Sequence, residues 1–230
     1  MAERSEIFGT LSSSDLGRSQ IRSRFVRRGR NLAEVTLVFA FILGAVWTPP
    51  GIVNSFFCVV AAACVVIFAS YGNWTRAELG LTRPLAGATG TLVAGIFLCA
   101  AIALIGIPLR FVDPGYVLPW TQSMQYVIWS LAQEFILQSV FFLRLEAVFG
   151  SRKAVVAAAF LFALAHIPNP ILTILSFWGG LLFCESFRRW RNLFPLGIVH
   201  AALGLTIAAS LPDKWLHHMR VGIGYLTLHH

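Results

Sequence analysis

Apolar and polar positions fall in long blocks along the chain, and several apolar blocks approach the length of a membrane-spanning helix. A helix needs about 20 apolar residues to cross the hydrocarbon core of a bilayer. Breaks between the blocks carry turn residues, such as Thr48-Pro49-Pro50-Gly51 and Asp113-Pro114-Gly115. The pattern predicts an all-α fold, a polytopic transmembrane bundle with about seven spans, at residues 31–48, 52–71, 87–108, 120–143, 154–168, 171–187 and 193–211.

Composition supports a membrane protein. Hydrophobic residues make up 57% of the chain and charged residues 12%, with a mean hydropathy of +0.73. Soluble domains carry about 25% charged residues. Because no segment between the apolar blocks is long enough to fold as a soluble domain, we expect one transmembrane domain over residues 31–211.

The positive charge predicts the orientation. Residues 1–30 are rich in Arg and Ser and lack a hydrophobic period, which indicates a disordered cytoplasmic tail near anionic lipid headgroups rather than a nucleic-acid-binding segment. A cytoplasmic N-terminus puts most other basic residues inside as well, namely Arg76, Arg83, Arg144, Arg152, Lys153, Arg188, Arg189 and Arg191. Residues 212–230 then form an extracytoplasmic C-terminal tail. We expect the bacterial plasma membrane as the location.

The predicted fifth and sixth spans are short, and Pro168-Asn169-Pro170 joins them. This segment cannot be regular helix. Irregular backbone at membrane depth is tolerated only when protein buries it or when it lines a water-filled cavity. The segment is therefore a first indication of a polar pocket.

Three ionisable residues are predicted at similar depth on three different spans. Glu134 lies near the middle of the fourth span, His166 within the fifth and His200 within the seventh. An ionisable group at the bilayer centre costs at least about 3 kcal/mol, so it indicates a functional site by default. We expect the three side chains to line one cavity.

Polar residues surround Glu134. Ser130, Glu134 and Gln138 follow i, i+4, i+8 and share a helix face, and Gln133 adjoins them. Without the histidines, these amides and the hydroxyl would be explained equally well as hydrogen bonds that hold helices together.

A buried carboxylate and two imidazoles suit hydrolysis. Glu134 can act as general base on water, while His166 and His200 orient the water and stabilise the oxyanion. The same three residues are alternatively a zinc ligand set. The chain contains no H-E-x-x-H motif, so we expect no metal and no other cofactor, with zinc as the alternative. It also contains no G-x-S-x-G motif, which argues against a serine triad.

Three short motifs resemble the CAAX-protease and bacteriocin-processing (Abi) family of intramembrane endopeptidases. Gln133-Glu134-Phe135-Ile136-Leu137-Gln138 is similar to their E-E-x-x-x-R motif, Phe162–His166 matches F-x-x-x-H, and His200 fits the histidine of H-x-x-x-N. The similarity covers roughly residues 74–210. It implies an intramembrane protease of glutamic type, with Glu134, His166 and His200 as catalytic residues. Residues around them are Ser130, Gln133, Gln138, Phe162, Asn169 and Gly204.

The chain departs from these motifs at three positions. Gln133 replaces the first glutamate, Gln138 the arginine and Gly204 the asparagine. The family usually assigns the base to the first glutamate, so either Glu134 has taken over that role or the chain is a relative without catalysis. The two glutamine replacements remove one negative and one positive charge together, which favours a retuned site.

The favoured hypothesis is therefore an endopeptidase that cleaves a hydrophobic or lipidated membrane peptide, with membrane lipids as its other partners. One alternative is a non-catalytic peptide-binding or bacteriocin-immunity protein that uses the same cavity. Another is a proton-coupled transporter, although such proteins often contain paired repeats and none is visible here. The substrate and the oligomeric state stay open.

Overall fold

The computed structural model describes residues 13–72, 74–106 and 119–227, with side chains described from residue 26 onward. These residues are all helical or loop, which confirms the predicted all-α class. The elements are α1 (Ser13–Trp47), α2 (Ile52–Tyr71), α3 (Ala88–Gly106), α4 (Trp120–Glu134), the π-helix η1 (Phe135–Phe142), α5 (Leu143–Phe149), α6 (Ser151–Leu164), α7 (Pro170–Trp190), α8 (Phe194–Ser210), α9 (Asp213–Leu216), the 3₁₀ helix η2 (His217–Met219) and α10 (Gly222–Leu226).

Five stretches of helix are long and apolar enough to cross a membrane: Val26–Trp47, Ile52–Tyr71, Ala88–Gly106, Trp120–Phe149 and Pro170–Trp190. The fourth runs without a break through α4, η1 and α5. Helix α8 is apolar but has 17 residues, and α6 has 14. Large apolar side chains such as Phe97 and Leu104 are exposed on the outer faces, where lipid rather than water is the suitable solvent. The chain is a multi-pass membrane protein.

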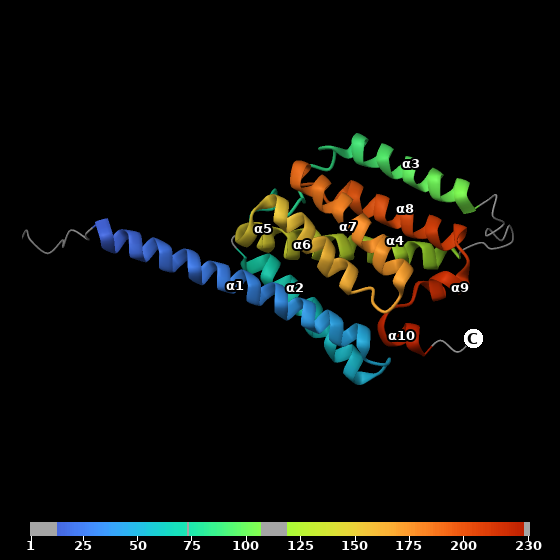
Figure 1. The fold of residues 1–230 in the computed structure, drawn as a ribbon, viewed down its shortest axis with the longest axis horizontal. Coiled ribbons are helices and arrows are strands. Elements are labelled where there is room, and N and C mark those ends of the chain that lie inside the picture. Colours follow the sequence, from blue (N-terminus) through green and yellow to red (C-terminus); the bar gives the residue numbers. More distant parts are fainter. Residues whose placement is uncertain (1–12, 73, 107–118, 228–230) are drawn as a thin grey trace, which may run out of the picture.

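The first helix begins earlier than the predicted first span. Residues 13–30, expected to be part of a disordered tail, continue α1 toward the N-terminus. They contain no proline and many good helix formers, and extending an existing helix costs far less than starting one. Figure 1 shows this part of α1 projecting beyond the other helices. The rest of the expected tail, residues 1–12, lies outside the described residues.

The predicted C-terminal tail is also folded over most of its length. Residues 213–226 form α9, η2 and α10, which lie beside one end of the bundle (Figure 1). Asn169 donates from Nδ2 to the backbone oxygens of Leu216 and Arg220, at 2.8 and 3.1 Å. Gly222 donates its N–H to Ile167 O at 2.9 Å. The residues predicted to form a tail are thus a folded segment that packs against the connection between α6 and α7.

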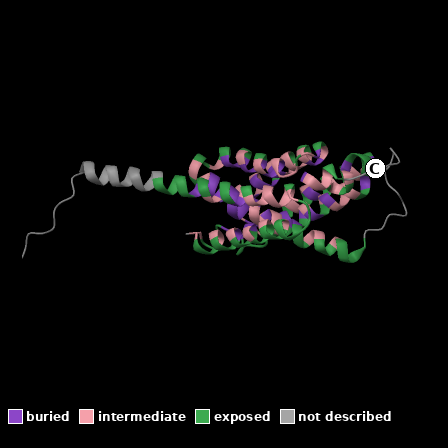
Figure 2. Ribbon diagram, turned by 90° about the horizontal axis from the view of Figure 1, so that it is seen from below, coloured by how far each residue is buried: buried purple, intermediate pink, exposed green. Residues whose placement is uncertain are grey.

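Buried residues gather in the interior of the bundle, and exposed residues follow its outer faces (Figure 2). The main helix pairs are α6 with α7, α3 with α8, α4 with α8, and α1 with α2. Helices α4 and α8 approach closely because Gly197 has no side chain. A methyl group at this position would overlap the Leu131 side chain. This pair of helices carries the candidate site.

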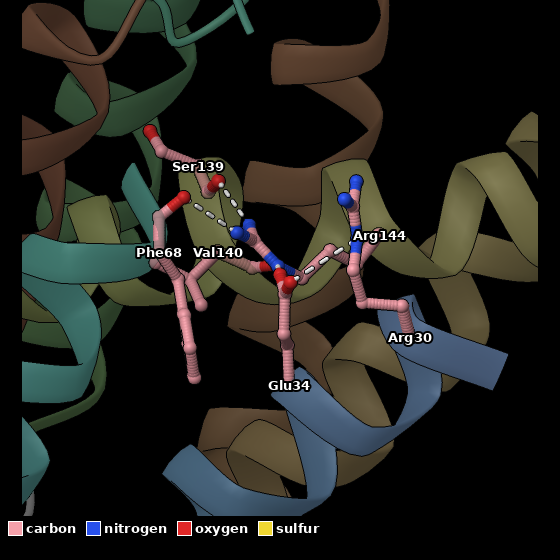
Figure 3. A network of polar contacts seen from close by, with 6 residues as sticks. All are labelled: Arg30, Glu34, Phe68, Ser139, Val140 and Arg144. Atoms are coloured by element: carbon pink, nitrogen blue, oxygen red, sulfur yellow. Dashed lines mark hydrogen bonds and ion pairs between the residues drawn. The ribbon is translucent and has the colours of Figure 1, made fainter. Parts of the chain in front are cut away.

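Arg144, expected in a loop, is instead fully buried. Its Nε donates to Glu34 Oε2 at 2.6 Å and its Nη2 to Phe68 O at 2.8 Å. Nη1 donates to Val140 O and Ser139 O, at 3.2 and 3.3 Å. Figure 3 shows the guanidinium joining α1, α2 and the carbonyl groups of η1. The arginine thus holds the part of this continuous helix that follows Glu134 against α1 and α2.

Candidate active site

Glu134 and His200 form the central contact of the site. Glu134 is the last residue of α4 and is fully buried, and His200 lies midway along α8. His200 Nδ1 is 2.9 Å from Glu134 Oε1, and Gln138 Nε2 donates to Glu134 Oε2 at 3.0 Å. With the carboxylate as acceptor, Nδ1 of His200 carries the hydrogen. Both carboxylate oxygens are therefore held by N–H donors.

The π-helix η1 begins directly after Glu134. Its wider turns are seen in the hydrogen bond from the Leu143 N–H to Gln138 O, five residues back. π-helical turns are rare and occur often at functional sites. Here Glu134 and Gln138 remain in contact across the change in helix type. The hydroxyl of Ser139, the residue after Gln138, donates to Leu79 O at 2.9 Å.

His166 lies in the turn that follows α6. Its Nδ1 is 2.7 Å from Phe162 O, and because a carbonyl oxygen can only accept, Nδ1 carries the hydrogen. The Phe162 ring contacts both histidines edge-on, with centroids 4.8 Å from His166 and 5.7 Å from His200. The Phe183 ring stacks on His200 at 5.5 Å and 18°. The two imidazoles are thus held by neighbouring aromatic rings.

A cavity of about 480 Å³ lies beside these histidines. Most of its lining is apolar, and the polar side chains in its wall are those of Tyr126, Gln133, His166, Ser176 and His200. Glu134 is not part of the wall. It lies behind His200, whose own side chain is 12% exposed. The expected grouping is therefore present in part: both histidines line one cavity, and the carboxylate reaches it through His200.

The other predicted residues have different surroundings. Gln133, Phe162 and Gly204 line the cavity, whereas Ser130 and Gln138 are fully buried and are not part of its wall. Asn169, predicted to lie beside the catalytic groups, holds the C-terminal segment and caps α7 by accepting from the Leu172 N–H at 3.1 Å. Asn169 thus joins the proline-flanked connection to the C-terminal segment and to the start of α7.

The predicted zinc ligands do not surround a common point. Glu134 and His200 are hydrogen-bonded to each other, and among the residues described here no three His, Cys, Asp or Glu side chains form a candidate metal site.

The site residues all lie in a part of the chain that is similar to a known protein family. Residues 116–206 match a family model, "Type II CAAX prenyl endopeptidase Rce1-like". The resemblance expected from the three motifs is thereby confirmed for this part of the chain. The matched region contains Glu134, His166, His200 and Gln133. Neither the curated proteins nor the solved structures include a match to this chain.

Two residues of the matched region were not predicted from the sequence. Phe183 stacks on His200, and an apolar residue in an apolar helix gives no signal of such a role. Tyr126 lines the cavity, and its signal was present, since Tyr126, Ser130 and Glu134 share the i, i+4, i+8 face of one helix.

Proposed function

We propose that this protein is an intramembrane endopeptidase that hydrolyses a peptide bond in a membrane-associated peptide or protein tail. The observation that carries the proposal is the 2.9 Å contact between Glu134 and His200, with His200 and His166 both facing one cavity. The Rce1-like match over residues 116–206 supports the same class of reaction.

In this proposal His200 is the general base. The sequence favoured Glu134 in that role, but a fully buried carboxylate behind the histidine reaches water only through it. Glu134 holds the Nδ1–H tautomer of His200, so Nε2 carries the lone pair on the other side of the ring. A carboxylate also stabilises the imidazolium that forms when Nε2 takes a proton, as in serine-protease triads.

The reaction adds one water across the amide. His200 Nε2 removes a proton from the water, whose oxygen attacks the carbonyl carbon and gives a tetrahedral oxyanion. The same proton then passes to the amide nitrogen, the C–N bond breaks, and a carboxylic acid and an amine leave. His166 has its Nδ1–H on Phe162 O, so its Nε2 is free to accept the second water hydrogen and orient the attack.

The proposed substrate carries an apolar or lipidated segment. Apolar side chains form most of the cavity wall, and two of the lining residues, Trp129 and Trp178, are also 55% and 66% exposed. A substrate segment dissolved in the bilayer can therefore approach the cavity from the lipid side. Membrane lipids are the other partners, and the reaction needs no metal or cofactor.

The accompanying topology has a cytoplasmic N-terminus in a bacterial plasma membrane. The seven spans comprise the five long apolar helices together with α6 and α8, which are short enough to need the surrounding helices for burial of their ends. Single cysteines placed at Arg152 and Lys214 and labelled with an impermeant maleimide on whole cells test this. The topology predicts labelling of the Lys214 site alone, and the reverse pattern contradicts it.

Cleavage is tested with purified protein and a farnesylated peptide that ends in a CAAX sequence, incubated in ¹⁸O-labelled water. Mass spectrometry should find two fragments, with one ¹⁸O in the new carboxylate. Binding of the peptide without any fragment would contradict an endopeptidase.

That negative result is the one expected of the alternative function, a non-catalytic peptide-binding or immunity protein. The observation in its favour is that the cavity-facing residue of the first motif is an amide, Gln133, where the family has a carboxylate. Gln133→Glu separates the two cases. If wild type binds without cleaving and this variant cleaves, the natural chain is a binding protein.

A further inference from the structure

Helices α4 and α8 meet along a line of paired residues. Gly197 lies against Leu131, and seven residues later Gly204 lies against Tyr126. A methyl group at position 204 would overlap the Tyr126 hydroxyl oxygen and contact its ring carbons at 2.6 Å. The absence of a side chain on Gly204 is thus what allows the phenol to pack against α8.

The Tyr126 hydroxyl lies near the proposed base. Gly204 and His200 are four residues apart on α8, about one helical turn or 6 Å along the axis. Tyr126, Gly204 and His200 all line the same cavity. On α4, Tyr126 and Glu134 share a face two turns apart, so the contacts Tyr126–Gly204 and Glu134–His200 are successive contacts along one helix pair.

The proposed reaction lacks a hydrogen-bond donor for its oxyanion. In their neutral forms both histidines have committed their hydrogens, His166 to Phe162 O and His200 to Glu134. Their Nε2 atoms are then acceptors. Other side chains that line the cavity have donors, namely the Tyr126 hydroxyl, the Gln133 amide, the Ser176 hydroxyl and the indole N–H groups of Trp129 and Trp178. Among these, the Tyr126 hydroxyl is held against Gly204, one helical turn from His200.

We propose that the hydroxyl of Tyr126 donates a hydrogen bond to the carbonyl oxygen of the scissile peptide as that oxygen becomes an oxyanion. This assignment rests on the proposed endopeptidase function. The bond grows stronger as negative charge develops, so it stabilises the transition state more than the bound substrate. Gly204 then acts indirectly, by leaving room for the phenol.

The test compares Tyr126→Phe with wild type on the farnesylated CAAX peptide. Loss of one oxyanion donor lowers kcat about 10²- to 10³-fold, and KM should stay unchanged because the ring is kept. Two uncleavable ligands give a second measurement. A phosphinate analogue, whose oxygens imitate the oxyanion, should bind more weakly to the variant by a similar factor, whereas a reduced-amide analogue without that oxygen should bind equally well to both.

Matched controls separate this role from packing. Tyr71→Phe removes a phenol hydroxyl from a residue that is 83% exposed on α2 and should leave all constants unchanged. Gly204→Ala should lower kcat by displacing the phenol, and its effect should not add to that of Tyr126→Phe. Gly90→Ala, at a glycine with open space beside it, is its control.

The outcomes are distinct. If the wild-type protein cleaves the peptide and Tyr126→Phe has the same kcat, the inference is overturned and the proposed function stands. Equal weakening of both analogues also overturns it, because that indicates a packing role. A kcat loss in Gln133→Leu alone assigns the donor to Gln133 instead. No turnover by wild type overturns both the function and this inference.

Discussion

Arg144 on α5 and Glu34 on α1 are joined by a 2.6 Å ion pair, although 110 positions separate them in the sequence. The arginine side chain is fully buried and also donates to the backbone oxygens of Phe68, Ser139 and Val140. This one side chain therefore links the first two helices to the segment that directly follows Glu134.

Replacing Arg144 should strongly destabilise the fold. Arg144→Met leaves Glu34 without its main partner and removes the side-chain donor from three backbone oxygens, and breaking a buried pair costs about 3–5 kcal/mol. The melting temperature in detergent should fall clearly, while Arg152→Met, at an exposed position on α6, should leave it unchanged. Equal melting temperatures for the two variants would show that the network contributes little.

Replacing Asn169 should release the C-terminal segment. Asn169→Ala removes the hydrogen bonds to Leu216 O and Arg220 O, worth about 1–3 kcal/mol together. Amide hydrogen exchange in α9 and α10 should become faster. The control is Asn192→Ala, which removes an equivalent pair of bonds to Pro84 O and Ala86 O. If both variants changed the C-terminal amides alike, the proposed role of Asn169 would be wrong.

Metal removal should not stop cleavage. The proposed reaction uses proton transfer through His200, and the residues around it do not form a zinc site. After passage through a strong chelator, the purified protein should retain its rate on the farnesylated peptide and contain well under one zinc per chain. Loss of activity that zinc alone restores would contradict this and return Glu134, His166 and His200 to the role of ligands.

The sequence predicted well how deep in the membrane the site residues lie, but it did not predict which way their side chains point. Apolar blocks and turn residues predicted the long helices, and the unusual cost of Glu134, His166 and His200 in a membrane identified the region of the site. Depth along a helix does not say which way a side chain points. The position of Glu134 behind His200 depends on the close approach of α4 to α8 at Gly197 and on the π-helix that follows Glu134.

Partners distant in sequence explain the other differences. Arg144 is buried because Glu34 and Phe68 O reach it from other helices, which no local pattern indicates. Asn169 was linked to the site because it lies between two prolines close to His166. Its actual partners belong to a C-terminal segment that was expected to be a tail. In each case the residue type was noted, and its environment was set by packing.

The most direct measurement of the central claim is the turnover of the farnesylated CAAX peptide by Glu134→Gln. The change is nearly isosteric but replaces an acceptor of the His200 Nδ1–H with an amide, which disturbs the tautomer and charge stabilisation of the base. We predict a fall in kcat of about 10²- to 10⁴-fold, by analogy with the loss of the carboxylate in a catalytic triad, with the melting temperature unchanged or higher. Glu185→Gln, which removes a carboxylate paired with Arg188 and Arg189 at the end of α7, should cleave like wild type. Wild-type turnover by Glu134→Gln would contradict the Glu134–His200 pair as the catalytic base.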